Sequence, residues 1–215
     1  EQGKLTEELR VQILAAETQV AVDDLYRPYR PKRRTRATIA KEKGLEPLAN
    51  LILLQKMTVS PLEEAENYIN PEKEVSTAED ALNGAKDILA ESVSDNADFR
   101  THIRELTMKH GQLLSAAKDP EAESVYEMYY EFSESLSKLA GHRILAISRG
   151  EKEKFLIVKI DAPVDRILSY LDRKLITAPS APTAAVLHEV TEDAYNRLIA
   201  PAIEREIRND LFEKA

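Results

Sequence analysis

A short stretch near the start of the sequence concentrates positive charge with no acidic residue between the cations. Guanidinium and ammonium groups bind phosphate, and arginine can do so through two parallel hydrogen bonds. The whole chain of 215 residues has a formal net charge of −8, so this stretch differs sharply from its surroundings. The residues predicted to bind nucleic-acid phosphate are Arg27, Arg30, Lys32, Arg33, Arg34, Arg36 and the nearby Lys41.

Three interpretations of these cations stay open at this point. Pro28 and Pro31 favour an extended loop that could meet phosphate, and Tyr26 and Tyr29 could stack on bases or pack beneath the loop. The anion could instead be an acidic face of the same protein, since residues 60–98 are rich in Glu and Asp. The third interpretation is a solvated loop with no specific partner.

The sequence offers little that could support catalysis. Its four histidines show no i, i+4 pairing typical of a helical zinc site, and there is no cysteine to ligate a metal. Neither a phosphate-cradling glycine loop nor a nucleophile motif is present. We therefore expect no enzyme activity, no catalytic residue, no metal or other cofactor, and no small-molecule substrate. The histidines are His102, His110, His142 and His188.

Composition and periodicity predict a mostly α fold, in which a multi-helix N-terminal domain precedes a helical region with one antiparallel β-hairpin. Only six glycines occur, and helical periodicity extends from Thr6 to about Lys118. Within it, Ser60 and Pro61 form a helix-start signature. The β-rich runs around Gly150 predict the hairpin, over Arg143–Ile160.

Two later segments carry more specific expectations. The apolar residues of 125–136 fit either a helix or a strand, and the helix is favoured. A last helix should start near Asp193, bend or break at Pro201, and continue with Ile203, Ile207 and Leu211 facing protein. No apolar run reaches the roughly 20 residues of a membrane helix, and the first residues are not a signal peptide, so a cytoplasmic location is expected.

Three stretches in order resemble one known family, the Tex family of bacterial transcription accessory proteins. They cover DLYRPYRPKRRTRATIAKEKGLEPLA, GHRILAISRGEKEKFLIVKI and DAYNRLIAPAIEREIRNDLFEKA. The resemblance implies a non-catalytic piece of a longer transcription factor that binds RNA or DNA and contacts RNA polymerase. A protein-interaction scaffold that docks on RNA polymerase or the ribosome, without touching nucleic acid, is the alternative.

The same resemblance implies an organisation along the chain. Residues 1–118 correspond to an N-terminal helical domain that lacks its first segment, and residues 119–200 to a central helical region with the hairpin. Residues 201–215 begin a helix that leads to a YqgF-like domain. Helix-hairpin-helix modules and an OB-fold RNA-binding domain follow in the family, and none of these lies within this sequence.

Overall fold

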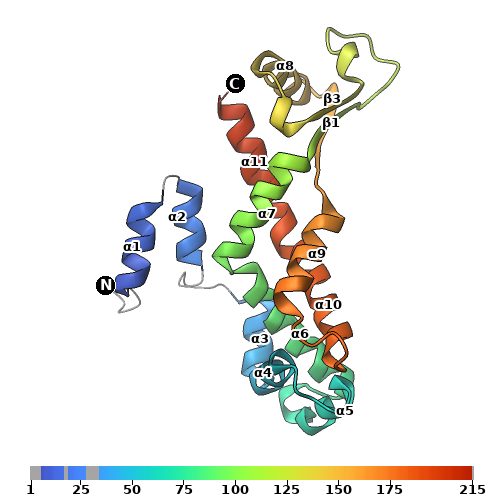
Figure 1. Ribbon diagram of the computed structural model, residues 1–215. Helices are drawn as coiled ribbons and strands as arrows, with labels where there is room; N and C mark the ends of the chain where they lie inside the picture. The colour runs from blue at the N-terminus through green and yellow to red at the C-terminus, as the bar shows by residue number, and fades with distance from the viewer. Residues whose placement is uncertain (1–5, 17–18, 28–33, 215) are drawn as a thin grey trace. The chain divides into compact units, whose positions relative to one another are not determined.

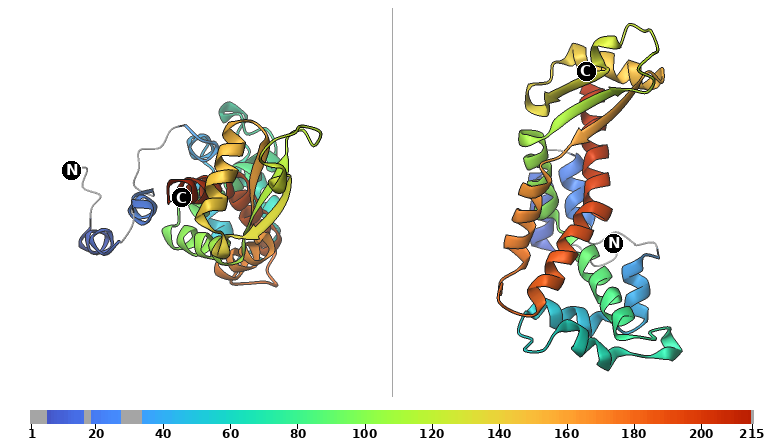
Figure 2. Two further views of the ribbon diagram at one scale, coloured as in Figure 1. Left: turned by 90° about the horizontal axis from the view of Figure 1, so that it is seen from above. Right: turned by 90° about the vertical axis from the view of Figure 1, so that its right-hand side faces the viewer.

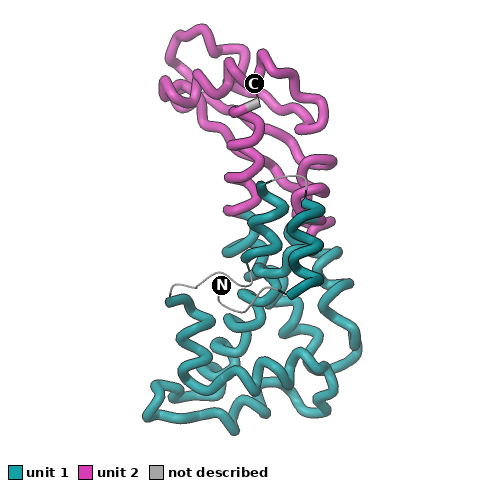
Figure 3. Tube along the Cα trace, turned by 90° about the vertical axis from the view of Figure 1, so that its left-hand side faces the viewer, with its two compact units in different colours: residues 1–101, 168–200 teal, residues 102–167, 201–215 magenta. Residues whose placement is uncertain are grey.

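A computed structural model describes residues 6–16, 19–27 and 34–214 (Figure 1). Its contacts divide the chain into two compact units, shown in separate colours in Figure 3. Unit 1 contains Glu1–Thr101 and Leu168–Ala200, and unit 2 contains His102–Ile167 and Pro201–Ala215. The sequence ranges 1–118, 119–200 and 201–215 stay a prediction, because compactness does not by itself define a family's domain boundaries.

Unit 1 is helical, and its centre is α6 (Ala78–Ser94), which α3, α4, α5 and α10 all contact. Small residues let these helices approach closely: a Cβ on Gly84 would meet Leu45 Cδ1 at 2.3 Å and Ala40 Cβ at 3.3 Å. The other elements are α1 (Glu7–Ala15), α2 (Gln19–Tyr26), α3 (Arg36–Glu42), α4 (Glu46–Leu54), α5 (Pro61–Ala65), the 3-10 turns Glu66–Tyr68 and Pro71–Lys73, and α10 (Thr183–Asp193). Parts of α7 (Ala97–His110) and α9 (Val164–Leu175) complete the unit.

Polar side chains cap helix ends in unit 1, both at the start of α5 and at the end of α9. Ser60 caps α5 by accepting a hydrogen bond from Glu63 N at 3.2 Å, with Pro61 in the first turn, which confirms the predicted start signature. At the end of α9, the buried amide of Gln55 donates to the Leu175 carbonyl and accepts from Thr177 N, each at 2.8 Å. Backbone groups that a helix end leaves unpaired are thereby satisfied.

Unit 2 contains a three-stranded antiparallel sheet in the order β2-β1-β3 (Figure 2). In its register Leu113 of the central strand lies opposite both Glu134 and Ile160. The strands are β1 (Gln112–Ala117), β2 (Glu131–Ser135) and β3 (Leu156–Asp161), with the 3-10 turns Glu127–Tyr129 and Leu136–Lys138 and the helices α8 (Gly141–Lys152) and α11 (Ala200–Lys214). The core of the unit includes Leu113, Ile147, Leu156 and Val158.

The mostly α fold with a small antiparallel sheet is confirmed, but the hairpin predicted over Arg143–Ile160 is wrong. Its first half is helix α8, and only Leu156–Asp161 is a strand. Ile144, Ile147 and Gly150 are buried at helical spacing, and a Cβ on Gly150 would meet Leu156 Cδ1 at 2.5 Å. A short apolar run such as Ile144–Ile147 fits a helix and a strand equally well, and tertiary packing decided for the helix.

Two other segments are strands where helices were predicted. Residues 112–117 form the central strand, although LLSAA contains no β-branched residue. The helix favoured over 125–136 is also wrong, because that segment contains a 3-10 turn and strand β2. Strand propensity is weak compared with pairing, and β1 gains hydrogen-bonded neighbours on both sides.

The last helix is longer than predicted and unbroken. The chain is helical from Thr183 to Lys214, so the predicted start near Asp193 is wrong. Of the predicted bend or break at Pro201, the break does not occur. A π-helix over Ala194–Ile199 directly precedes Pro201, and Ala200 N donates to the Tyr195 carbonyl five residues back. This wider turn accommodates the proline ring, which clashes with an ordinary α-turn. Ile203 and Ile207 are buried as predicted, and Leu211 is half-buried.

Among the residues that the structure describes, no helix is both long and apolar enough to cross a membrane.

Candidate functional site

The structure describes only part of the predicted basic stretch. Arg30, Lys32 and Arg33 lie outside the described residues. Arg27 directly follows α2 and is half-buried. Arg34 is exposed just before α3, and Arg36 and Lys41 are exposed in its first and last turns. The exposed cations that can be located therefore lie on this one short helix or directly before it.

The position of α3 follows from its cap and its small residues. Thr35 and Thr38 form a reciprocal capping box, and Thr35 Oγ1 also donates to Glu91 Oε1 of α6 at 3.1 Å. Ala37 and Ala40 are buried. The contact with α6 therefore uses alanines, while Arg36 and Lys41 lie on the exposed part of the helix.

Arg34 has an ionic partner within its own segment. Its Nη2 lies 3.2 Å from Glu42 Oε2, and the two side chains are 68% and 57% exposed. Such an exposed pair contributes at most about 1 kcal/mol to stability. Arg34 can therefore exchange Glu42 for a phosphate at little cost.

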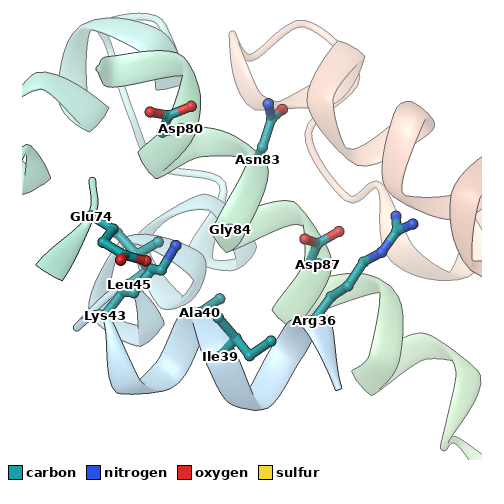
Figure 4. Close-up of a pocket in the computed structure, with 10 residues that line it drawn as sticks. All are labelled: Arg36, Ile39, Ala40, Lys43, Leu45, Glu74, Asp80, Asn83, Gly84 and Asp87. Atoms are coloured by element: carbon teal, nitrogen blue, oxygen red, sulfur yellow. The ribbon is translucent and has the colours of Figure 1, made fainter. Parts of the chain in front are cut away.

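Arg36 borders a polar cleft in which charges of both signs meet (Figure 4). The cleft consists of two cavities of about 300 Å³ and about 390 Å³, which share Arg36, Asn83 and Asp87 as lining residues. The figure shows Arg36 beside Asp87, with Lys43 and Glu74 at the opposite end. The second cavity adds Lys86, Glu189, Val190 and Asp193.

Arg197 organises the acidic side of this cleft. It lies 2.8 Å from Asp193 Oδ2 and 3.8 Å from Asp87 Oδ1. Its hydrogen bond holds the pKa of Asp193 below the usual range, and the same contact raises the pKa of Arg197. Burial raises the pKa of Asp87, although Arg197 and Arg36 act in the opposite direction. The cleft is thus suited to ion pairing, and its carboxylates already have cationic neighbours.

A second charged cluster was not anticipated from the sequence. His188 of α10 lies between two carboxylates, with Nδ1 2.7 Å from Asp172 Oδ2 and Nε2 2.7 Å from Glu192 Oε1. Thr191 Oγ1 donates to the other oxygen of Asp172 at 2.6 Å. The hydrogen bond with Asp172 is the main reason that the pKa of His188 is raised. The i, i+4 spacing of His188 and Glu192 was a usable signal, whereas Asp172 lies in another helix.

Neither cluster resembles a metal centre. Over residues 6–16, 19–27 and 34–214, no group of three His, Asp or Glu side chains is arranged to hold a metal ion.

Comparison with known proteins assigns the family. The sequence model described as Tex central region-like matches residues 56–215, which is most of the chain. The chain belongs to the Tex family. Over its whole length it is 49% identical to an uncharacterized protein of Bacillus subtilis, YdcI, of which it covers 30%. Transcriptional accessory protein Tex of Neisseria gonorrhoeae is 35% identical over 79% of the chain, which covers 23% of that relative.

The similarity of this Tex chain extends beyond bacteria. The human S1 RNA-binding domain-containing protein 1 is 29% identical over the whole chain, which covers 23% of it. This Tex chain therefore spans less than a third of the length of these relatives. A general role in transcription follows from the family. The matches to YdcI and to the human protein extend over the whole chain and so include the cations of α3. The family model begins at residue 56, and it includes Asp87 and Asp193 of the cleft but not α3.

Proposed function

We propose that this Tex chain is a non-catalytic, nucleic-acid-binding part of a cytoplasmic transcription accessory factor, and that the cations around α3 bind phosphate. The observation that carries the proposal is the exposure of Arg34, just before α3, and of Arg36 and Lys41 on that short helix, which directly follows a basic stretch. Phosphate contacts carry little sequence information, so binding here is largely independent of base sequence.

The names of the relatives support the same proposal. One relative is called a transcriptional accessory protein, and another is named for an S1 RNA-binding domain. The partners proposed for the full-length protein are accordingly RNA or DNA, together with RNA polymerase. The charges of the cleft are consistent with a binding role, because Asp87 and Asp193 both form ion pairs with Arg197.

A second candidate function has specific support in the structure. Arg34 pairs with Glu42, and Arg36 lies beside Asp87 of α6, within the acidic range 60–98. If these acids are the only anions that the cations meet, α3 serves to fix the fold of unit 1. The protein would then act as a scaffold that docks on other proteins.

Salt-dependent binding separates the two candidates. Full-length protein with Arg33, Arg34 and Arg36 changed to Ala should bind RNA and duplex DNA more weakly across a salt series. The slope of log affinity against log salt should become shallower by roughly 2 to 3, because each phosphate contact to duplex DNA contributes about 0.9. The melting temperature should change little, since exposed cations contribute little to stability.

A matched variant controls for net charge. Lys56, Lys138 and Lys152 are exposed cations that belong neither to α3 nor to the basic stretch, and changing all three to Ala removes the same charge. This control should keep the full salt slope. If the arginine variant instead keeps its affinity and slope but melts at a lower temperature, the scaffold function is correct.

A further inference from the structure

The loop between β1 and β2 combines exposed apolar side chains with uncompensated negative charge. We propose that this acidic loop, residues 118–131 including Glu131 at the start of β2, is a docking surface for a protein whose complementary face has an apolar socket rimmed by Lys and Arg. This surface lies in unit 2 and is independent of the phosphate-binding role proposed for α3.

Two apolar side chains project from the loop. Val125 is 84% exposed and Met128 is 72% exposed, more than the other exposed hydrophobic residues of unit 2. They are three residues apart, and only Met128 belongs to the 3-10 turn Glu127–Tyr129. Tyr126 and Tyr129, one position later with the same spacing, are both buried, so exposed and buried side chains alternate along this segment. Met and other large apolar residues are enriched at protein interfaces, where they form the anchors that partners bury.

The exposure is not that of an unstructured loop, because three neighbouring tyrosines hold the chain in place. Tyr126 and Tyr129 are each 5% exposed. Tyr126 Oη donates to Glu153 Oε2 at 2.7 Å, and its ring lies 5.8 Å from that of Phe155. Tyr130 Oη donates to the Ala122 carbonyl at 2.7 Å. Two anchors presented by an ordered backbone bind at a lower entropic cost than a flexible loop.

The charge around the anchors decides what kind of partner fits. The loop contains one cation, Lys118, and five exposed carboxylates. Among the described residues none of these carboxylates forms an ion pair, in contrast to Glu134 of β2, which pairs with Arg143 at 3.0 Å. The five are Asp119, Glu121, Glu123, Glu127 and Glu131.

This field repels the phosphates of nucleic acid and attracts a basic protein face. An apolar centre with a charged rim is the usual anatomy of a protein–protein interface. With two anchors the contact is small, so we expect a transient, salt-sensitive complex.

Site-specific photo-crosslinking in the native host tests the proposal on the full-length protein. Benzoylphenylalanine is placed at position 125 or 128, and at position 54 as the control. Leu54 is 61% exposed, but the surrounding residues 47–59 contain a single charge, Lys56. The partner peptide is then identified by mass spectrometry.

We expect position 125 or 128 to give one discrete protein adduct, at least fivefold stronger than any from position 54. The crosslinked peptide should contain apolar residues flanked by Lys or Arg. Changing Glu121, Glu123 and Glu127 to Gln should reduce the adduct at least fivefold. Changing Glu46, Glu66 and Glu79, three exposed acids of unit 1, to Gln removes the same charge and should leave it unchanged.

Three results would overturn the proposal. The first is that positions 125 and 128 give no adduct, or an adduct no stronger than that from position 54. The second is crosslinking to nucleic acid, and the third is a yield that does not respond to loss of the three loop carboxylates. Circular dichroism melting of each variant checks that the fold is intact. We expect exposed Glu→Gln changes to leave it so, and a lost adduct then means that the partner no longer docks.

Discussion

The cations around α3 and the acidic loop of unit 2 are both exposed and strongly charged, but their neighbourhoods differ. Arg34 has Glu42 beside it, and Arg36 borders a cleft that Asp87 and Asp193 also line. The carboxylates of residues 118–131 have no ionic partner among the described residues. The cations of unit 1 therefore have acidic neighbours, whereas the carboxylates of the acidic loop in unit 2 pair with no cation in the described part of the chain. The net charge of −8 does not reveal this difference between the two regions.

The largest expected effect comes from removing the cation that is buried in unit 1. Arg100 is 1% exposed, and its guanidinium donates to the carbonyl and the hydroxyl of Ser94. Changing Arg100 to Ala leaves buried acceptors without this donor and should lower the free energy of unfolding by about 3 kcal/mol, measured by urea denaturation.

Arg104, one turn along α7, is the matched comparison for Arg100. Its pair with Glu206 at 3.0 Å is partly exposed, and Arg104→Ala should cost only about 1 kcal/mol. Equal costs for the two arginines would contradict the idea that burial makes the difference.

The next effect concerns the packing that keeps the cations of α3 close to the acids of α6. A Cβ on Gly84 would lie 2.3 Å from Leu45 Cδ1, so Gly84→Ala should destabilise the protein by about 1–3 kcal/mol through overpacking. Thermal and urea unfolding measure this change. Gly141→Ala is the control, since a Cβ there meets nothing within 4 Å, and a loss of similar size would show that close packing is not the cause.

A smaller effect is expected on nucleic-acid binding when Arg36 loses its acidic neighbour. Changing Asp87 to Asn removes an acid that lies beside Arg36 and is otherwise held by Arg197. If Arg36 can exchange that acid for phosphate, nucleic-acid binding by the full-length protein should strengthen. The salt slope should become steeper by up to about 0.9, one phosphate contact. Asp80→Asn, which removes another acid from the same cleft, is the control and should leave the salt slope unchanged. If Asp87→Asn also leaves the salt slope unchanged, Arg36 does not reach phosphate.

The smallest expected effect is a pH dependence from His188. Its pKa is raised above 6.5 by Asp172 and Glu192, so its stabilising contribution is complete below 6.5 and is lost as pH rises through the higher value in the folded state. The side chain is 48% exposed, which limits the contribution to less than about 1 kcal/mol.

His188→Gln should therefore reduce stability at acidic pH and leave it nearly unchanged at alkaline pH, as followed by melting across a pH series. His142→Gln, at an exposed histidine, should keep the profile of the original protein. A His188→Gln loss that is the same at every pH would instead indicate a packing role.

The helices of unit 1 could be predicted from the sequence because their signals are local. Ser60 and Pro61 start α5 as expected, since a cap depends on residues three positions away. The sheet could not be predicted in the same way, because β1 is a strand on account of its pairing with β2 and β3. A long loop separates β1 from β2, and α8 lies between β2 and β3. Local periodicity contains no information about such distant pairing.

The candidate sites show the same limit. The residue types of the basic stretch and their density were evident, and Arg34 and Arg36 are exposed as a phosphate-binding role requires. Their neighbours were less accessible, because Asp87 meets Arg36 only through the packing of α3 on α6. The carboxylates around His188 come from two helices, so a histidine expected to be solitary is the centre of an ionic cluster.

The division of unit 1 into two stretches of sequence also determines the order in which the molecule can fold during synthesis. The contacts of α6 with α10 require Thr183–Asp193, which leave the ribosome about 100 residues after α6 itself. At 5–20 residues per second this delay is roughly 5–20 s. The whole sheet, which ends at Asp161, can pair within that time. The face of α6 that meets α10 in the folded protein therefore lacks this partner in the nascent chain throughout the interval.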